Sequence, residues 1–193
     1  MSADPICETV NPEAATEEVM VTEGKLANVF VYARTGNTLD TFQFEVPTTA
    51  VVLEHQGCHF VPHVIGVQAQ QSLSIVNGDP TTHNTHAMPR NNPEWMQSQP
   101  QGAPAFERKF LRPEPLIPIK DNQHPWEKAY LGVFSHPFFA VSNVDGAYKI
   151  AGLPPGQYTI VAWHEKYGEQ TFDVTVGSKE RKTLDFTFTS PNN

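Results

Sequence analysis

The sequence predicts an all-β protein built from β-sandwiches, and three observations support this prediction. No segment shows the sustained apolar period of 3.6 residues that is typical of an amphipathic helix. Apolar residues occur instead in short, β-branched runs. Seventeen prolines and twelve glycines separate these runs, as expected for a chain with many turns. With 193 residues, the chain is long enough for one domain or two small ones, each with its own core.

Each strand is expected where a short apolar or alternating run lies between turn residues. The stretch 70–76 alternates polar and apolar residues and therefore predicts a strand with one buried face. By contrast, residues 89–104 contain four prolines and are predicted to form a loop. The predicted strands are 19–21, 26–32, 51–54, 64–67, 70–76, 105–110, 116–119, 130–134, 139–141, 157–164, 170–176 and 183–188.

The order of these strands indicates an arm and two domains. Residues 1–17 are rich in Glu, Pro and Ala and have little to bury, so we predict an N-terminal arm. Residues 18–136 are assigned to a first β domain. Residues 137–193 are assigned to a second, smaller antiparallel domain, because Asp-Gly and Pro-Gly turns occur at 145–146 and 155–156.

Charge and hydropathy exclude several classes of partner. The formal charge of −8 argues against nucleic acid and anionic membranes as partners. No run of about 18 apolar residues occurs, so no membrane-spanning segment is predicted. The first residues have neither a basic head nor an apolar stretch and are not a signal peptide. The chain is therefore expected to be either cytosolic or the mature form of an exported protein. Its oligomeric state is unknown.

The chain contains two cysteines, Cys7 and Cys58. In an exported protein such a pair is expected to form a disulfide, here tying the arm to the core. The alternative is that Cys58 is a thiolate metal ligand near His55, His59 and His63. The disulfide would favour a periplasmic or secreted location.

Two histidines follow a predicted turn at 77–80, where Gly and Pro interrupt the strand. These are His83 and His86, and histidine is the commonest metal ligand in proteins. On a straight strand they would face opposite sides, so His86 becomes a ligand only if the strand bends. Met88 and Met96 could serve Cu(I), although packing is the expected role of both.

A second cluster of metal-ligating types lies about forty residues later. Asp121, His124 and Glu127 recur at every third position, so one turn of backbone could direct all three side chains the same way. An exposed polar loop is the alternative interpretation. Because the chain contains two such clusters, the sequence predicts that both loops close on one metal ion.

The residues around these clusters resemble those of a bacterial, exported cupredoxin-like family, related to plastocyanin and azurin. The motifs that carry the resemblance are Gly57-Cys58-x-Phe60-x-Pro62-His63-Val64, Asn77-x-Asp79-x-x-x-His83-Asn84-x-His86-Ala87 and His124-Pro125-Trp126-x-Lys128-Ala129-Tyr130. The stretch from Asp145 to Glu165 resembles the carboxypeptidase-regulatory-like (transthyretin-like) β-sandwich. The resemblance implies a Greek-key β-sandwich, a periplasmic location, bound copper and electron transfer.

The sequence departs from this family at the metal ligands. The family's last loop reads Cys-x-x-His-x-x-Met, whereas these positions are Asp121, His124 and Glu127 here. A blue copper site needs the thiolate, so the site should not be blue. Imidazoles with carboxylates instead suit copper(II), zinc, iron(II) or manganese(II), and we expect copper first, with zinc or iron as alternatives.

Several neighbouring residues are candidates for a supporting role. His63 matches a family position and is expected to be either a further ligand or a partner of a ligand. His86 is given the same two roles. Trp126 should shield the site beside His124, and Asn84 is expected to support it from outside the ligand set.

Three functional classes remain open. The first is a metalloenzyme with a non-blue site, such as a copper- or iron-dependent oxidoreductase that acts on a small molecule. The second is a periplasmic metal carrier or an electron-transfer protein with a redox partner. The third is a cupredoxin that has lost its metal and serves as a binding module. No catalytic residue is assigned, because no nucleophile and base occur in a known arrangement.

Overall fold

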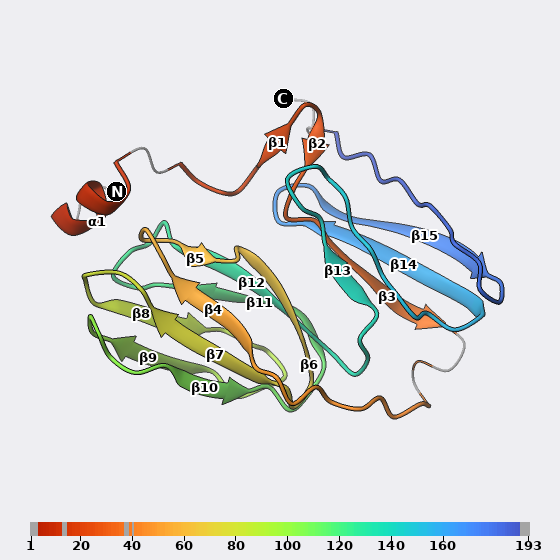
Figure 1. Ribbon diagram of the computed structural model, residues 1–193, viewed down its shortest axis with the longest axis horizontal. Helices are drawn as coiled ribbons and strands as arrows, with labels where there is room; N and C mark the ends of the chain where they lie inside the picture. The colour runs from red at the N-terminus through yellow and green to blue at the C-terminus, as the bar shows by residue number, and fades with distance from the viewer. Residues whose placement is uncertain (1–3, 13–14, 37–38, 40, 190–193) are drawn as a thin grey trace. The chain divides into compact units, whose positions relative to one another are not determined.

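The computed structural model describes residues 4–12, 15–36, 39 and 41–189, and it confirms the all-β fold (Figure 1). The chain divides into two compact units. Unit 1 comprises residues 1–17 and 45–135, and unit 2 comprises residues 18–44 and 136–193. No described helix is long and apolar enough to cross a membrane.

Unit 1 is a sandwich of two sheets, with strand orders β10-β7-β4-β5 and β6-β12-β11-β8-β9. The first sheet contains β4 (Val51–His55), β5 (Phe60–Val61), β7 (Ser72–Asn77) and β10 (Phe106–Lys109). The second contains β6 (Val64–Gln68), β8 (His83–Ala87), β9 (Trp95–Gln99), β11 (Glu114–Lys120) and β12 (Lys128–Phe134). Strand β9 lies within the predicted loop 89–104, where its pairing with β8 overrides the flanking prolines.

The core of unit 1 lies between these two sheets. Alternate residues of β7 point inward, so Leu73 and Ile75 are fully buried while Ser72 and Ser74 are not. They join one apolar cluster with residues of the opposite sheet such as Ile117 and Leu131. This continuous core confirms the predicted sandwich for unit 1.

The strand register brings the histidine-bearing segments to one end of this sandwich. Strands β4 and β7 run parallel, and His55 at the end of β4 pairs with Asn77 at the end of β7. The chain then returns through the turn 78–82 into β8. The loop 121–127 joins β11 to β12, and β11 is also paired with β8.

Residues 4–12 of the predicted N-terminal arm lie against unit 1, to which the arm is tied as the sequence predicted. Its helix α1 (Pro5–Val10) begins with Pro5 at the first turn and Asp4 as the N-cap, a favourable combination at a helix start. Cys7 is fully buried and forms the predicted disulfide with Cys58. The side chain of Asn11 also donates a hydrogen bond to the carbonyl of Gly57.

Unit 2 contains one antiparallel sheet of order β13-β3-β14-β15 and a short hairpin. The sheet strands are β3 (Phe30–Gly36), β13 (Phe139–Val141), β14 (Gly156–His164) and β15 (Gly168–Val176), and the hairpin strands are β1 (Val21–Thr22) and β2 (Lys25–Leu26). Its core contains aliphatic and aromatic side chains, among them Val31, Phe138, Tyr158 and Ile160.

Unit 2 differs from the sequence prediction in two respects. Residues 18–44 were assigned to the first domain, but β3 pairs with β13 and β14, so this segment belongs to unit 2. The predicted strand 183–188 forms no strand ladder, although Leu184 and Phe186 pack against the core as the alternating pattern requires. Sequence alternation reports which face is buried and not whether a neighbouring strand is paired.

Candidate metal centre

The first part of the site is built by the turn between β7 and β8. Asn77 shapes this turn: its amide donates to the carbonyl of Thr81 at 2.8 Å, and its side-chain oxygen accepts the backbone N–H of Asp79 at 2.9 Å. The turn directs the carboxylate of Asp79 inward, where its Oδ2 lies 3.0 Å from Nε2 of His83. His83 itself is fully buried at the start of β8.

Two consecutive backbone amides hold the carboxylate of Asp79. Gly57 and Cys58 have left-handed φ angles of 63° and 58°, which turn both N–H groups toward the same side. Each donates to one oxygen of Asp79 at 2.7 Å. Cys58 is also bonded to Cys7. The short segment 57–58 therefore carries the disulfide and also holds the carboxylate that contacts His83.

The second part of the site is the loop 121–127, which the structure folds as the spacing predicted. The carboxylate of Asp121 accepts the backbone N–H groups of Gln123 at 2.6 Å and His124 at 3.1 Å, which curls the loop. The N–H of Glu127 then bonds to the carbonyl of His124 at 2.9 Å. Asp121, His124 and Glu127 are all buried, at 1%, 3% and 0% exposure.

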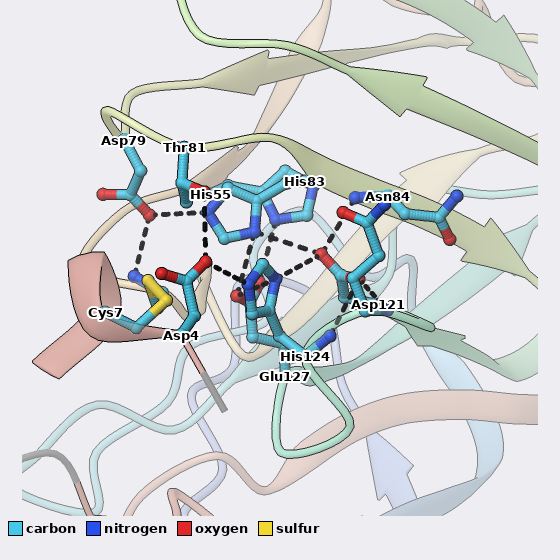
Figure 2. Close-up of polar contacts among 12 residues, drawn as sticks. Asp4, Cys7, His55, Asp79, Thr81, His83, Asn84, Asp121, His124 and Glu127 are labelled. Carbon is cyan, nitrogen blue, oxygen red and sulfur yellow. Dashed lines mark hydrogen bonds and ion pairs between the residues drawn. A yellow bond between two sulfur atoms is a disulfide. The ribbon is translucent and has the colours of Figure 1, made fainter. Parts of the chain in front are cut away.

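Four side-chain atoms from these two loops converge at one point (Figure 2). Nδ1 of His83 lies 3.0 Å from Oδ2 of Asp121 and 3.0 Å from Oε1 of Glu127. Nδ1 of His124 lies 3.1 Å and 3.6 Å from the same two oxygens. The structure therefore brings together the two histidines and both carboxylates that the sequence singled out.

The opposite nitrogen of each of these histidines faces a second carboxylate. Nε2 of His83 lies 3.0 Å from Asp79, and Nε2 of His124 lies 3.1 Å from Oδ2 of Asp4, the helix N-cap. The hydroxyl of Thr81 donates to the same Asp4 oxygen at 3.1 Å. A carboxylate only accepts hydrogen bonds, so each Nε2 can donate to its own carboxylate, and Nδ1 is the nitrogen on the side of Asp121 and Glu127 that could ligate a metal after losing its proton.

A third histidine, His55, completes the cluster. Its ring stacks on that of His83 with 4.4 Å between centroids and an interplanar angle of 12°. Its Nδ1 lies 2.9 Å from Oε2 of Glu127, and its Nε2 lies 2.9 Å from the hydroxyl of Thr85. His55 thus fixes the orientation of the Glu127 carboxylate and leaves the other oxygen, Oε1, directed toward His83 and His124.

The electrostatics of the centre reflect this excess of carboxylates. Burial alone would lower the pKa of His83, but hydrogen bonds to Asp121, Asp79 and Glu127 outweigh it and raise the pKa to about 11. Burial likewise opposes ionisation of Asp121, yet bonds from His83 and from backbone N–H groups hold its pKa well below the usual range. The pKa of Asp79 is lowered against its burial by His83 and by the amides of Cys58 and Gly57. We therefore expect the imidazole of His83 to be protonated in the metal-free protein.

Two observations test whether a metal fits these residues. Oε1 of Glu127 is fully buried, and its polar contacts are with Nδ1 of His83 at 3.0 Å and Nδ1 of His124 at 3.6 Å. The four separations given above span 3.0 to 3.6 Å. Nitrogen and oxygen ligands about 2.0–2.2 Å from a four-coordinate ion lie about 3.3–3.5 Å apart. The four separations lie close to that range. The four ligand atoms of a partly overlapping set, from His55, His83, Asp121 and Glu127, all lie within 4.8 Å of one another.

The other predicted site residues lie outside this cluster. His63 is buried with its Nδ1 3.6 Å from Glu17, and His86 faces outward from β8 toward Glu94 and Asn122. β8 does not bend enough to reverse the alternation, so His83 and His86 point to opposite sides. The disulfide excludes Cys58 as a thiolate ligand, since its sulfur is already bonded.

Asn84 and Trp126 take supporting positions. The backbone N–H of Asn84 donates to Oδ2 of Asp121 at 2.8 Å. The ring of Trp126 lies 5.3 Å from that of His124, and its indole N–H donates to the carbonyl of Cys58 at 3.1 Å. Trp126 therefore ties the ligand loop to the disulfide segment.

Sequence reasoning missed three members of the cluster as site residues: His55, Asp79 and Asp4. Asp79 was recognised only as a turn residue, and His55 only as a neighbour of Cys58. A signal existed for Asp4, because Asp before Pro is a favourable start for a helix, although nothing local indicated that this helix would lie over His124.

Comparisons with known proteins come from structure searches and a family match. No curated protein matches the chain. Similar solved structures include a copper-containing nitrite reductase from Thermus scotoductus SA-01, with 15% identity, 52% of this chain and 25% of that chain covered, and a TM-score of 0.40. The chain thus spans about a quarter of that reductase's length. A Cu(I) structure of an amicyanin mutant has 15% identity, 55% and 98% coverage, and a TM-score of 0.39.

A third similar structure is the purple cupredoxin from Nitrosopumilus maritimus, with 18% identity, 39% of this chain and 81% of that chain covered, and a TM-score of 0.32. The family match concerns the C-terminal part, and it begins in the ligand loop, before the start of unit 2. Residues 122–189 match the carboxypeptidase regulatory-like domain, which confirms the resemblance stated from the sequence for this part of the chain.

Proposed function

We propose that unit 1 binds one divalent metal ion through Nδ1 of His83, Nδ1 of His124, Oδ2 of Asp121 and Oε1 of Glu127. The observation that carries this proposal is the approach of two imidazole nitrogens to two carboxylate oxygens, at separations of 3.0 to 3.6 Å, in the buried end of unit 1. Two buried carboxylates need positive charge beside them, which a divalent ion would supply in place of the proton on His83.

The donor set favours copper(II), with zinc and iron as alternatives. Two imidazoles and two carboxylates are borderline to hard ligands, whereas copper(I) prefers thiolates and thioethers. When bound, the ion would supply Lewis acidity or, for copper and iron, a redox couple. The two carboxylates offset the charge of a divalent ion, and Asp79 and Asp4 hold both imidazoles in the ligating orientation.

The four donors are buried. This favours a protein that holds a metal ion, such as a carrier, a buffer or a redox-active protein, over an enzyme that acts on a bulky substrate. All four ligating residues are at most 3% exposed. Asp4 covers the Nε2 edge of His124, so a substrate approaching from that side must first displace the N-terminal arm. We place the protein in the periplasm or outside the cell, because its only two cysteines form a disulfide.

Metal analysis tests the proposal directly. Protein purified without chelator should contain about one equivalent of metal, and the His83→Gln and Glu127→Gln variants should lose it. His59→Ala is the matched control, because His59 lies near the disulfide but outside the cluster. Circular dichroism should confirm that each variant remains folded.

Spectroscopy and proton release provide independent readouts. With copper(II), the protein should show weak visible absorption and the wide hyperfine splitting of a site without thiolate. Zinc binding at neutral pH should release protons, because the metal displaces the proton held on Nδ1 of His83. Unchanged metal content in folded His83→Gln and Glu127→Gln protein would refute the proposal, as would an intense thiolate-to-copper band.

A further inference from the structure

A second group of metal-ligating side chains lies on the outward face of the β8–β9 hairpin. His86 and Met96 are directly paired across the two strands, so their side chains share one face of the sheet. Met96 is 59% exposed. Neither residue belongs to the buried centre, which His83 enters from the other side of β8.

Both side chains contact the amide group of Asn122. The amide nitrogen of Asn122 lies 3.0 Å from Sδ of Met96 and 3.2 Å from Nδ1 of His86. The amide oxygen of Asn122 is 3.3 Å from the same Nδ1. One amide group therefore occupies the position between a thioether sulfur and an imidazole nitrogen.

Glu94 determines which nitrogen of His86 is available. Its Oε1 lies 2.6 Å from Nε2, so this nitrogen donates to Glu94 and Nδ1 is left facing the Asn122 amide. A carboxylate bonded to the outer nitrogen of a ligating histidine is the common arrangement in metal sites, where it fixes the ring and raises its basicity.

We propose that His86 Nδ1 and Met96 Sδ form a surface site for a soft monovalent cation of the copper(I) class. Thioether and imidazole together suit copper(I), whereas the oxygen-rich buried centre does not. The ion would take the place of the Asn122 amide nitrogen, and rotation of that amide would offer its oxygen as a third donor. Because Asn122 directly follows Asp121, the ion would bind next to the buried centre.

Met20 provides an internal control. Its sulfur also accepts from an asparagine amide, Asn28 Nδ2 at 3.6 Å, and it is 39% exposed. No imidazole shares that contact among the described residues. Both Met20 and Met96 thus contact an asparagine amide. Among the described residues, only the amide beside Met96 also contacts a histidine nitrogen.

The test is an anaerobic titration of the full chain with copper(I), in the presence of a competing chelator and with the buried centre already loaded with zinc. The protein carries isotope-labelled methionine methyl groups. The Met96 methyl resonance should shift with one equivalent of copper(I), while that of Met20 should not. Glu94→Gln should weaken binding about 10- to 100-fold, as is typical for loss of a ligand's partner. Met96→Leu and His86→Gln should weaken it at least as much, and Met20→Leu should leave it unchanged.

The surface site does not rest on the buried one. The double variant His83→Gln/His124→Gln, or the single Glu127→Gln if the double variant does not fold, should keep the Met96 shift. The proposal is overturned if copper(I) leaves the Met96 methyl resonance unmoved. It is equally overturned if Met96→Leu and His86→Gln bind copper(I) as tightly as the parent.

Discussion

The two units differ in whether their carboxylates are buried. Four carboxylates are buried among the described residues, and all of them lie in unit 1: Asp79, Glu114, Asp121 and Glu127. Three of these surround His83. In unit 2 the core cluster is aliphatic and aromatic, and its carboxylates lie toward the surface, as in the pair Arg34–Glu169, which is 40% and 42% exposed.

This difference separates residues that serve stability from residues that serve a site. Burying ionised groups costs several kcal/mol each, and well-packed apolar residues of similar volume often stabilise a core equally well or better. Unit 2 shows that this protein can build a core without buried carboxylates. We therefore attribute the buried charges around His83 to a function of the site and not to stability. The strongly shifted pKa values of His83 and Asp121 agree with this, because such shifts are typical of functional sites.

The largest expected effect comes from removing one central charge. Asp121→Ala should destabilise unit 1 by about 3–5 kcal/mol in the metal-free protein, since it leaves the His83 imidazolium without its main partner. Glu169→Ala makes the same chemical change in an exposed pair of unit 2 and should cost at most about 1 kcal/mol. Urea unfolding of both variants measures the contrast, and equal losses would contradict it.

The disulfide should stabilise unit 1 selectively. It joins residues 51 positions apart, so replacing both cysteines by alanine should cost unit 1 about 2–4 kcal/mol. Hydrogen exchange should report faster opening of β4 and β7 in this variant. Exchange in β14 and β15 of unit 2 is the control and should stay as in the parent. Equal acceleration in both units would show that the bond stabilises more than unit 1.

The stability of metal-free unit 1 should depend on pH with a sign set by His83. Its pKa rises on folding from 6.5 to about 11, so its contribution is fully present below about pH 6.5 and is lost as the pH rises toward 11. Asp121 and Asp79 have lowered pKa values, so their contributions are present above about pH 4 and are lost as the pH falls. Unit 1 should therefore be most stable between about pH 4 and 6.5.

Chemical denaturation with a chelator present measures this dependence. Above about pH 7, the free energy of unfolding should fall by up to about 1.4 kcal/mol per pH unit, the slope for one proton. His83→Gln should remove that slope. A slope that persists in folded His83→Gln protein would assign it to another group.

The smallest expected effect is in the apolar core of unit 2. Ile160→Val removes one buried methylene and should cost about 0.5–1.5 kcal/mol. The metal content and the proton release on zinc binding should match those of the parent. A loss of metal in this variant would mean that the two cores are coupled.

Local patterns predicted much of the fold and the four proposed ligands. The alternation in 70–76 and the spacing of Asp121, His124 and Glu127 involve only residues that are close in sequence. In the structure, β7 has alternating burial, and the three side chains of the loop contact one another. His55 enters the site through parallel pairing of β4 with β7, and β3 joins unit 2 by pairing with β14 more than 120 positions away. Such pairings leave no local trace in a single sequence.

The covalent closure of the arm has a consequence for competition at His124. Because Cys7 is bonded to Cys58, Asp4 is held on a short tether, and its carboxylate faces Nε2 at an effective concentration of about millimolar or higher. Free anions such as acetate would have to exceed that concentration to replace it. Reduction leaves only the longer backbone tether and lowers this effective concentration, so the edge of His124 should respond to added carboxylates more strongly in the reduced protein.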